Sequence, residues 1–574
     1  MSTGYFSSGI WSITMISTIQ AFPTTDGILV VWEVAAMIPD CLGFALYRQQ
    51  QGKSATVVDT WVGFEDQAQD HKPGEHQPST EWPVQKTNWT DFLAPTDAPV
   101  RYGVVPVLKD GATKVKPAYS APATWTEYVS AMPSGPLKPW FNRGTISAQW
   151  LSRAIGKDKK PAQTLEKAIS TKGNKIRDFL KGQLGARLLA LLAEAKKSKR
   201  DVYLALYELN DPELIAALTA MKGKAHVVLG NSTGKSDATA KDTEKNAGVL
   251  KKAGVDIVRR KIAPSRYAHN KFAVFCDGAQ KPKVVWTGST NWTRTGLCTQ
   301  NNNGLEITDD KVAAAYHDHW KAIYADGSKS PKALAVAGDH EWPFTIGKSR
   351  LSVWFTPTTK SGDLKEATKM IEDTEHGAVC LMLNPGNKGL LGPILEKAQD
   401  KKLYVRGVLN NFPAQGKDSP KDQLQLLAGD GQQQVFKGKQ IADVIRPAGI
   451  DKTADWWEHE IKNTGKFMIA VHSKVIVLDP AGKNPVVMTG SHNFSDRAST
   501  KNDDNLVIIR GDSQLALTYA ARIVSIYGQY RWQAWRNTPE GQKDKGLKRS
   551  DTWLSNRIGK GWAQTETRFW LGTA

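Results

Sequence analysis

The sequence predicts an α/β chain in which two similar α/β/α domains follow a small all-β sandwich. Two observations predict this class. Apolar strands alternate with amphipathic helices in the same order twice after residue 140, whereas the first 130 residues show strands without helical periodicity. A segment rich in helix breakers, residues 131–140, separates the two patterns and is expected to be a linker. We therefore expect three units, at residues 1–130, 140–345 and 346–574.

The N-terminal unit is expected to be an accessory β-sandwich. Its clearest strands cover residues 27–34, 43–48 and 101–108, which alternate or run apolar between turn residues. With Trp32 in an early strand and Tyr102 in a late one, the unit resembles a fibronectin type III or immunoglobulin-like module. Such a module would serve docking to a partner or a surface rather than catalysis.

An internal repeat organises the rest of the chain. In the first copy, expected strands cover residues 201–208, 225–229 and 255–259, and expected helices cover 176–197, 212–222 and 246–253. The second copy repeats this order with helices at 364–375 and 391–400 and strands at 378–383 and 403–409. Elements of these lengths predict two α/β layers, each a largely parallel sheet with helices on its faces.

Composition is typical of a globular protein without a membrane span. Of the 574 residues, 40% are hydrophobic and 23% are charged, and no apolar run approaches the roughly 20 residues that cross a bilayer. The first basic residue is Arg48, so no basic segment precedes an apolar signal-peptide core, and the four cysteines lack disulfide or zinc-site spacing. We expect a cytoplasmic protein with no integral membrane segment, although export by a non-Sec route stays open.

The net charge of +19 is concentrated on the repeat. Residues 1–135 hold 8 Lys and Arg against 13 Asp and Glu, which leaves +24 on residues 136–574. Such a field attracts polyanions, and a nucleic-acid backbone and a peripheral contact with an anionic membrane both satisfy it. Solvated surface lysines explain much of this charge equally well.

Both copies of the repeat end in the same signature. A strand with His and Lys two residues apart is followed by a second strand that ends in Gly-Ser-x-Asn. Because side chains two apart on a strand share a face, His and Lys can converge on one anion, while Ser and Asn add hydrogen-bond donors beside the glycine turn. The polar members are His269, Lys271, Ser289 and Asn291 in the first copy and His472, Lys474, Ser491 and Asn493 in the second.

The matched spacing of the two copies argues against coincidence. His269 precedes Gly288 by 19 residues and His472 precedes Gly490 by 18, within the same order of strands and helices. These motifs resemble those of the phospholipase D superfamily, in which two copies meet across a pseudo-twofold axis to form one site. The resemblance covers residues 140–574. It implies a phosphodiesterase that needs no metal or other cofactor and whose site is complete in a monomer.

One departure from the family pattern concerns the acid after the motif lysine. The family's Asp falls correctly at Asp479 in the second copy, but Cys276 takes that place in the first copy and Asp277 follows one residue late. A one-residue insertion at a strand end explains this, and so does a functional asymmetry between the two histidines. The acid behind His269 is therefore left open.

A second departure lies after Gly-Ser-x-Asn. Asp504 supplies the acid in the second copy, whereas the first copy has asparagines at 301–303 and an acid only at Glu306. We expect Asp504 to contact His472, because a carboxylate behind a histidine favours the charged imidazole of a general acid. His269 is then the nucleophile that attacks phosphorus, as the family resemblance also implies, while the Lys, Asn and Ser side chains hold the phosphate oxygens.

Three functions are compatible with these motifs. An intracellular phospholipase D or transphosphatidylase is favoured because two complete motifs in one chain resemble the lipid-active members of the superfamily. A nuclease or DNA-end phosphodiesterase is favoured by the charge of the repeat. Intact motifs in both copies argue against a catalytically silent binding module. Trp456 and Trp457, in a segment that lengthens the second copy, could stack a base, enter a lipid interface or pack their loop.

Overall fold

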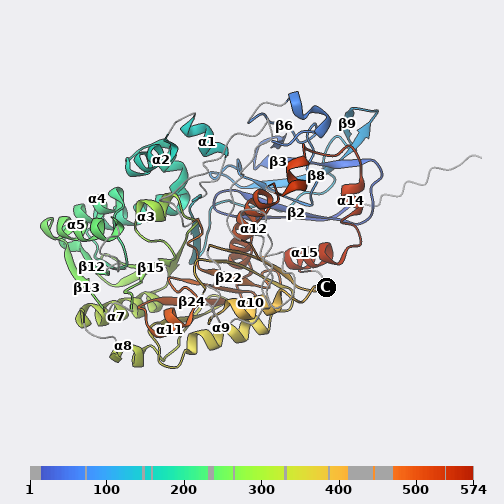
Figure 1. The fold of residues 1–574 in the computed structure, drawn as a ribbon. Coiled ribbons are helices and arrows are strands. Elements are labelled where there is room, and N and C mark those ends of the chain that lie inside the picture. Colours follow the sequence, from blue (N-terminus) through green and yellow to red (C-terminus); the bar gives the residue numbers. More distant parts are fainter. Residues whose placement is uncertain are drawn as a thin grey trace, which may run out of the picture.

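A β-rich unit precedes two α/β units. The computed structural model of the chain describes residues 15–70, 74–144, 149–156, 160–230, 238–262, 266–328, 332–385, 388–410, 444–445, 470–536 and 538–572. In Figure 1 the β-rich unit is blue, the first half of the repeat is green, and the second half is yellow to red. The α/β class with a preceding β unit is confirmed, while Trp456 and Trp457 lie outside the described residues.

The N-terminal unit packs two antiparallel sheets around one apolar core. Trp32 and Phe44, on opposite sheets, meet edge to face with ring centroids 5.5 Å apart, and Tyr102 is buried beside them. The predicted all-β sandwich is confirmed, and its likeness to fibronectin type III stays a prediction. One sheet has the order β1 (Ile16–Pro23), β2 (Ile28–Val34), β7 (Asn88–Asp91), and the other β4 (Ala55–Val57), β3 (Cys41–Gln50), β8 (Val100–Asp110), β9 (Lys114–Pro117). Short elements between them are β5 (Asp59–Thr60), η1 (Glu65–Asp70) and β6 (Gln77–Pro78).

The first α/β half has a sheet of seven described strands. Its order is β10 (Leu137–Phe141), β16 (Asn303–Thr308), β15 (Pro282–Gly288), β14 (Lys271–Cys276), β11 (Val202–Leu206), β12 (Ala225–Gly230) and β13 (Asp256–Arg260). Its helices are α1 (Gln149–Ile155), α2 (Pro161–Ser170), α3 (Lys175–Lys197), α4 (Pro212–Met221), α5 (Ala238–Lys252), α6 (Arg294–Cys298), α7 (Asp310–Asp326) and α8 (Lys332–Ala337), with the 3₁₀ turn η2 (Lys222–Lys224). Strand β10 occupies the end of the expected linker, where it pairs with β16 at the sheet edge.

The second half repeats this plan with a sheet of eight described strands. Its order is β17 (Trp342–Ile346), β18 (Ser349–Phe355), β24 (Asn505–Arg510), β23 (Val486–Gly490), β22 (Val475–Leu478), β19 (Gly377–Met382), β20 (Tyr404–Leu409) and β21 (Val444–Ile445). Its helices are α9 (Gly362–Glu372), α10 (Leu391–Lys397), α11 (Asp496–Thr500) and α12 (Ser513–Arg536). The order of equivalent strands is the same in both halves, as the internal repeat predicts.

The expectation of largely parallel sheets is wrong. Among the described strands, only β11–β12 and β12–β13 are parallel in the first half, and only β19–β20 and β20–β21 in the second. The strands that carry the motifs run antiparallel to their neighbours, because only residues 277–281 join β14 to β15. A parallel connection needs about a dozen residues or more. The alternating strands and helices that open each copy predict parallel pairing, whereas the motif strands that follow are joined by short hairpins.

The two halves share one apolar core. Helix α7 packs on the first sheet and α12 on the second, and side chains of both helices and both sheets join a single buried cluster. Tyr316 of α7 and Tyr519 of α12 are fully buried in it. Each half also has a buried apolar cluster of its own, and the shared cluster joins the two sheets, so that the strands β14–β16 and β22–β24 that carry the motifs are held together.

The chain returns to the N-terminal unit after α12. Helices α13 (Pro539–Lys543), α14 (Thr552–Ser555) and α15 (Gly561–Leu571) follow, and Figure 1 shows α14 and α15 in red beside the blue strands. The indole N–H of Trp553 donates to the carbonyl of Cys41 at 2.9 Å, and Trp570 stacks on Phe22 with centroids 5.3 Å apart. The end of the chain thus ties the β unit to the second half. No helix in the described part of the chain is both long and apolar enough to cross a membrane.

Candidate active site

Each His-x-Lys segment is bonded to the opposite half of the repeat. The backbone N–H of His269 donates to the carbonyl of Asp503 at 2.9 Å, and that of His472 donates to the carbonyl of Asn301 at 3.0 Å. A short parallel bridge accompanies each of these bonds. The histidines are therefore held by matching backbone contacts, and each contact uses the residues just before the last strand of the other half.

The Gly-Ser-x-Asn turns require glycine. Gly288 has φ 141° and Gly490 has φ 137°. A Cβ at Gly288 would lie 2.4 Å from the carbonyl oxygen of Asn303, and one at Gly490 would lie 2.3 Å from that of Asn505. Both the backbone conformation and this close approach exclude a side chain, so the turn can bring the following Ser and Asn beside the neighbouring strand.

Buried side-chain hydrogen bonds join the two turns across the axis. Thr287 donates its hydroxyl to Asn505 Oδ1 at 2.7 Å, and Asn303 Nδ2 donates to the hydroxyl of Thr489 at 2.8 Å. These residues stand at equivalent positions of the two motifs. Buried side-chain hydrogen bonds of this kind favour one arrangement of the groups that they connect, so the two motif copies form a single unit.

Asp504 supports His269 rather than His472. Its Oδ1 lies 2.7 Å from His269 Nδ1 and also accepts the hydroxyl of Ser491 at 2.6 Å. The expected contact between Asp504 and His472 is wrong, because the segment that carries Asp504 crosses to the first half, where the adjacent Asp503 binds the backbone of His269. The acid behind His269, which the sequence left open, comes from the second copy.

An amide takes the equivalent place behind His472. Asn302 Oδ1 lies 3.0 Å from His472 Nδ1 and accepts the hydroxyl of Ser289 at 2.7 Å. Asn302 and Asp504 stand at the same spacing, 14 residues after the glycine of their own Gly-Ser-x-Asn. The site is thus symmetric in backbone and asymmetric in charge, with a carboxylate behind one histidine and a neutral amide behind the other.

The surroundings keep both imidazoles neutral near pH 7. Burial lowers the pKa of His269 to about 4, although Asp504 acts to raise it. Burial and the Lys474 ammonium lower the pKa of His472 well below its usual value. A neutral ring that donates its Nδ1 hydrogen to Asp504 or Asn302 carries its lone pair on Nε2. Each histidine therefore presents a nucleophilic or basic nitrogen on the edge away from its support.

The two motif lysines are buried, each beside the histidine of its own motif. Lys271 Nζ donates to the carbonyl of His269 at 2.7 Å, and Lys474 Nζ donates to that of His472 at 2.6 Å. Burial lowers the pKa of Lys271 to about 7 and that of Lys474 well below its usual value. Each lysine also lowers the pKa of the histidine of the other half. The cluster is therefore one electropositive, desolvated site that an anion would stabilise.

Sequence analysis missed Glu208 at this site. Asn291 Nδ2 donates to Glu208 Oε2 at 2.8 Å, and the charge of Glu208 raises the pKa of Lys271. The side-chain oxygens of Asn291 and Asn493 are buried without a partner among the described residues. The signal for Glu208 was its place just beyond the apolar strand β11. The adjacent Tyr207 was also missed, and its ring lies 4.9 Å from that of His269.

Glu306 does not support a catalytic histidine. Its carboxylate accepts hydrogen bonds from the indole of Trp140 at 3.0 Å and from Arg187 at 2.9 and 3.0 Å. The structural equivalent of Asp504 is Asn302, four residues earlier, and Glu306 follows within β16. The expected supporting role of Glu306 is therefore corrected to a buried ion pair with Arg187.

The acid after the motif lysine is also structural. The carboxylate of Asp479 accepts the backbone N–H groups of residues 375–377 at 2.9, 2.8 and 2.9 Å, which fixes the turn before β19. Asp277 accepts the N–H groups of Ala279 and Lys281 in its own hairpin at 2.8 and 2.9 Å. The replacement by Cys276 thus concerns the far end of the strand and leaves His269 unaffected.

Two α/β halves that share one buried cluster of His, Lys and Asn define the architecture of a two-motif phosphodiesterase. Residues 189–324 and 394–526 both match the family described as the PLD-like domain of cardiolipin synthase. Both halves of the repeat thus carry a phospholipase D-like domain, as their motifs predict.

Several known proteins are similar to parts of this chain. Mitochondrial cardiolipin hydrolase of Xenopus tropicalis is 34% identical over 145 residues, which are 25% of this chain and 61% of that protein. The chain thus spans about three fifths of the length of this relative. Phosphatidylserine synthase of Haemophilus influenzae gives a TM-score of 0.40 at 12% identity, covering 64% of this chain and 91% of that one. Nuc of Salmonella typhimurium gives 0.21 at 20% identity, covering 25% and 88% respectively.

Proposed function

We propose that the chain hydrolyses or transfers a phosphodiester through a phosphohistidine intermediate, with a phospholipid as its substrate. The observation that carries this proposal is the pair of buried histidines from the two halves, each fixed through Nδ1 and each beside a motif lysine. Lysines and amides can neutralise the phosphate oxygens, so the reaction as proposed needs no metal. Both motifs lie in one chain, and we propose that a monomer suffices.

We assign the nucleophile to His269. Its neutral Nε2 attacks phosphorus, and the bond from phosphorus to the leaving oxygen breaks as protonated His472 donates a proton to that oxygen. The phosphorylated ring keeps its Nδ1 hydrogen and becomes cationic, and the carboxylate of Asp504 at 2.7 Å stabilises that charge. Asn302, being neutral, holds His472 in position without retaining its proton. Water or an alcohol, deprotonated by His472, then attacks phosphorus and releases His269.

His269 remains the proposed nucleophile, although Asp504 lies behind it and not behind His472 as the sequence predicted. On the sequence alone, a carboxylate behind a histidine favoured the general acid; in the structure the same carboxylate stands behind the expected nucleophile. His472 has no carboxylate beside it to stabilise its protonated form. The anionic phosphate of a bound substrate takes that part, because a negative charge beside the imidazole raises its pKa. His472 thus becomes protonated as the substrate enters.

A substrate with an activated leaving group tests the assignment. Bis(p-nitrophenyl) phosphate releases nitrophenolate without needing a proton, so His472→Ala should still form the phosphoenzyme and fail to hydrolyse it. We expect His472→Ala, denatured at alkaline pH where phosphohistidine is stable, to carry a nitrophenyl phosphoryl group on His269, His269→Ala to carry none, and the control Glu306→Gln to turn over like the wild type. Phosphate trapped on His472 in the His269→Ala variant would reverse the two roles.

Lipid substrates are favoured by the relatives named above. The description of the matching family names cardiolipin synthase, and the relative at 34% identity is a cardiolipin hydrolase. Nucleic acid is the second candidate, since residues 136–574 carry +24. A cytoplasmic location and a peripheral contact with anionic membranes are further parts of the lipid proposal.

A parallel assay separates the two substrates. Wild-type and His269→Ala protein, both in EDTA to silence contaminating metal nucleases, would be given liposomes of phosphatidylcholine, phosphatidylglycerol or cardiolipin, and single- and double-stranded DNA. We expect head-group release that is lost in the variant. DNA cleavage lost in the variant, with intact liposomes, would replace the lipid proposal by the nuclease.

A further inference from the structure

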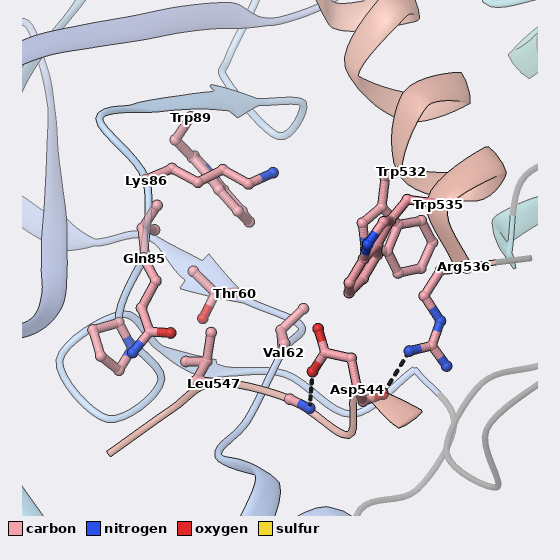
Figure 2. Close-up of a pocket in the computed structure, with 13 residues that line it drawn as sticks. Thr60, Val62, Gln85, Lys86, Trp89, Trp532, Trp535, Arg536, Asp544 and Leu547 are labelled. Atoms are coloured by element: carbon pink, nitrogen blue, oxygen red, sulfur yellow. Dashed lines mark hydrogen bonds between the residues drawn. The ribbon is translucent and has the colours of Figure 1, made fainter. Parts of the chain in front are cut away.

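A cavity of about 300 Å³ lies where the β unit meets the end of the chain, far along the sequence from both motifs. One wall comes from the β unit, with Lys86 and Trp89, and the other from the end of α12, with Trp532 and Trp535. Figure 2 shows the two walls facing each other across an open space. Ligand pockets of this size occur preferentially between domains.

The walls are mainly aromatic and aliphatic. Trp89, Trp532 and Trp535 line the cavity together with Val62 and Leu547. Indole rings offer large flat faces to a planar ligand, and offset or edge-to-face ring contacts add to the gain from burial. The shape and the lining therefore suit a flat aromatic body.

Lys86 gives the cavity a cationic group. Its side chain reaches into the space between the tryptophans (Figure 2) and makes no hydrogen bond or ion pair with any described residue. Lys86 is exposed, so a ligand that enters the cavity can reach its ammonium group. The nearby charges of Arg557 and Glu566 offset each other, since they lie 3.6 Å apart.

The other charges of the lining nearly cancel. Arg536, on the wall opposite Lys86, donates to the backbone carbonyls of Gly541 and Asp544 at 2.6 and 2.5 Å. The carboxylate of Asp544 lies beside it and accepts the N–H of Gly546 at 3.0 Å. With Lys86 included, the lining carries one positive charge in excess, so a cation is disfavoured and a single negative charge is complemented.

We propose that this cavity binds a small aromatic monoanion, with its ring system between the indoles and its acidic group on the Lys86 ammonium. The wall helix α12 also reaches the catalytic site, because Tyr530 OH accepts from Asn301 Nδ2 at 3.3 Å and the carbonyl of Asn301 holds the backbone of His472. The cavity lies apart from the motif cluster, and helix α12 connects the two.

Three matched probes test the charge requirement on the full chain. Isothermal titration would compare 2-naphthoate, neutral 2-naphthamide and cationic 2-naphthylmethylammonium. A charge-assisted hydrogen bond predicts that wild type binds the naphthoate about tenfold more tightly than the amide, with the ammonium weakest. Equal affinity for acid and amide, tighter binding of the ammonium, or no heat from any probe would overturn the proposal.

Variants locate the binding. Lys86→Gln should bring the affinity for naphthoate down to that for the amide, whereas Lys53→Gln, on the exposed turn after β3, should leave both unchanged. Trp535→Leu should weaken both probes, and melting curves by circular dichroism would confirm that each variant is folded. Retention of the acid preference in folded Lys86→Gln would show that the anion binds elsewhere and would reject this site.

Discussion

The two histidines of the site differ in what stands behind them. His269 has the buried carboxylate of Asp504, and His472 has the amide of Asn302, although both supports occupy the same position of the repeat. Backbone contacts to the two histidines are equivalent, so the groups that accept from Nδ1 differ mainly in charge. A repeat can therefore divide the two roles of a phosphoryl transfer by a single substitution of acid by amide.

The support on the first side is also more strongly anchored. Arg260, fully buried at the end of β13, pairs with the carboxylate of Asp503 and with Asp326 at 2.9 Å. Asp503 binds the backbone of His269 and precedes Asp504. On the second side Asn301 stands in place of Asp503. The ion pair of Arg260 with Asp503 therefore holds the segment that carries Asp504, so that the carboxylate of Asp504 stays beside the ring of His269.

Removing the carboxylate should produce the largest effect. Asp504→Asn keeps the size of the side chain and removes its charge, so that the cationic phosphohistidine loses its counterion. We expect kcat to fall about 10⁴-fold, comparable to the loss of the acid in a catalytic triad. Steady-state kinetics on an activated diester would measure it, with Glu306→Gln as a buried-acid control. A fall below tenfold would show that the two supports are interchangeable.

Breaking the anchor should have the next largest effect. Arg260→Met leaves Asp503 buried and unpaired, which should cost about 3 kcal/mol of unfolding free energy. We also expect kcat to fall by about 10- to 100-fold, as for groups that orient a reacting side chain. Denaturant unfolding and kinetics would be measured together, and Arg260→Lys should restore part of kcat.

A matched control separates positioning from stability. Arg187→Met breaks a buried pair with Glu306 in the same half, away from the histidines. It should lower the free energy of unfolding without changing kcat. If Arg187→Met lowered kcat as much as Arg260→Met at equal loss of stability, Arg260 would have no specific part in holding His269.

The sequence predicted the composition of the site better than its connections. The repeated motifs named the His, Lys and Ser side chains that the structure brings together, although His269 precedes β14, and His472 and Lys474 precede β22. The glycine of each turn is a local property that the sequence shows directly. The crossing of Asp504 to the first half depends on how two complete sheets pack. The equal spacing of Asn302 and Asp504 was visible, but nothing local indicates which ring each would meet.

In the fold, too, the sequence predicted local features better than contacts between distant segments. The repeated order of strands and helices predicted two α/β halves, whereas the linker expected at residues 131–140 contains most of β10, an edge strand of the first half. The antiparallel motif strands were missed because short apolar strands carry no mark of direction, and only the tight hairpin after Cys276 indicated it. The return of residues 538–572 to the β unit rests on contacts such as Trp553 to Cys41, which pair segments far apart in the sequence.

Removing the acid beside the first lysine should have a smaller effect. Glu208 raises the pKa of Lys271, which burial lowers to about 7. In Glu208→Gln that pKa should fall further, so that less Lys271 is protonated at neutral pH and phosphate binding weakens. We expect kcat/KM to fall about tenfold at pH 7.5 and to recover toward pH 6, because protonation restores the ammonium. A loss that does not depend on pH would assign Glu208 only to orienting Asn291.

Converting the amide to an acid should give the smallest and most informative change. In the free enzyme the pKa of His472 is well below 6.5, so the proton that it donates is lost as pH rises, and kcat/KM should fall on the alkaline side. Asn302→Asp adds a negative charge at 3.0 Å from Nδ1 and raises this pKa. The alkaline limb of the kcat/KM profile should then move upward by about one pH unit, a shift typical of one neighbouring charge.

The limb that moves identifies the role of the ring. A shifted alkaline limb with an unchanged acid limb means that His472 must be protonated to act and is the general acid. If the acid limb moves upward instead, His472 must be neutral to act, so it is the nucleophile. In that case the carboxylate of Asp504 supports the general acid, and the original rule that an acid marks the charged histidine holds with the two halves exchanged.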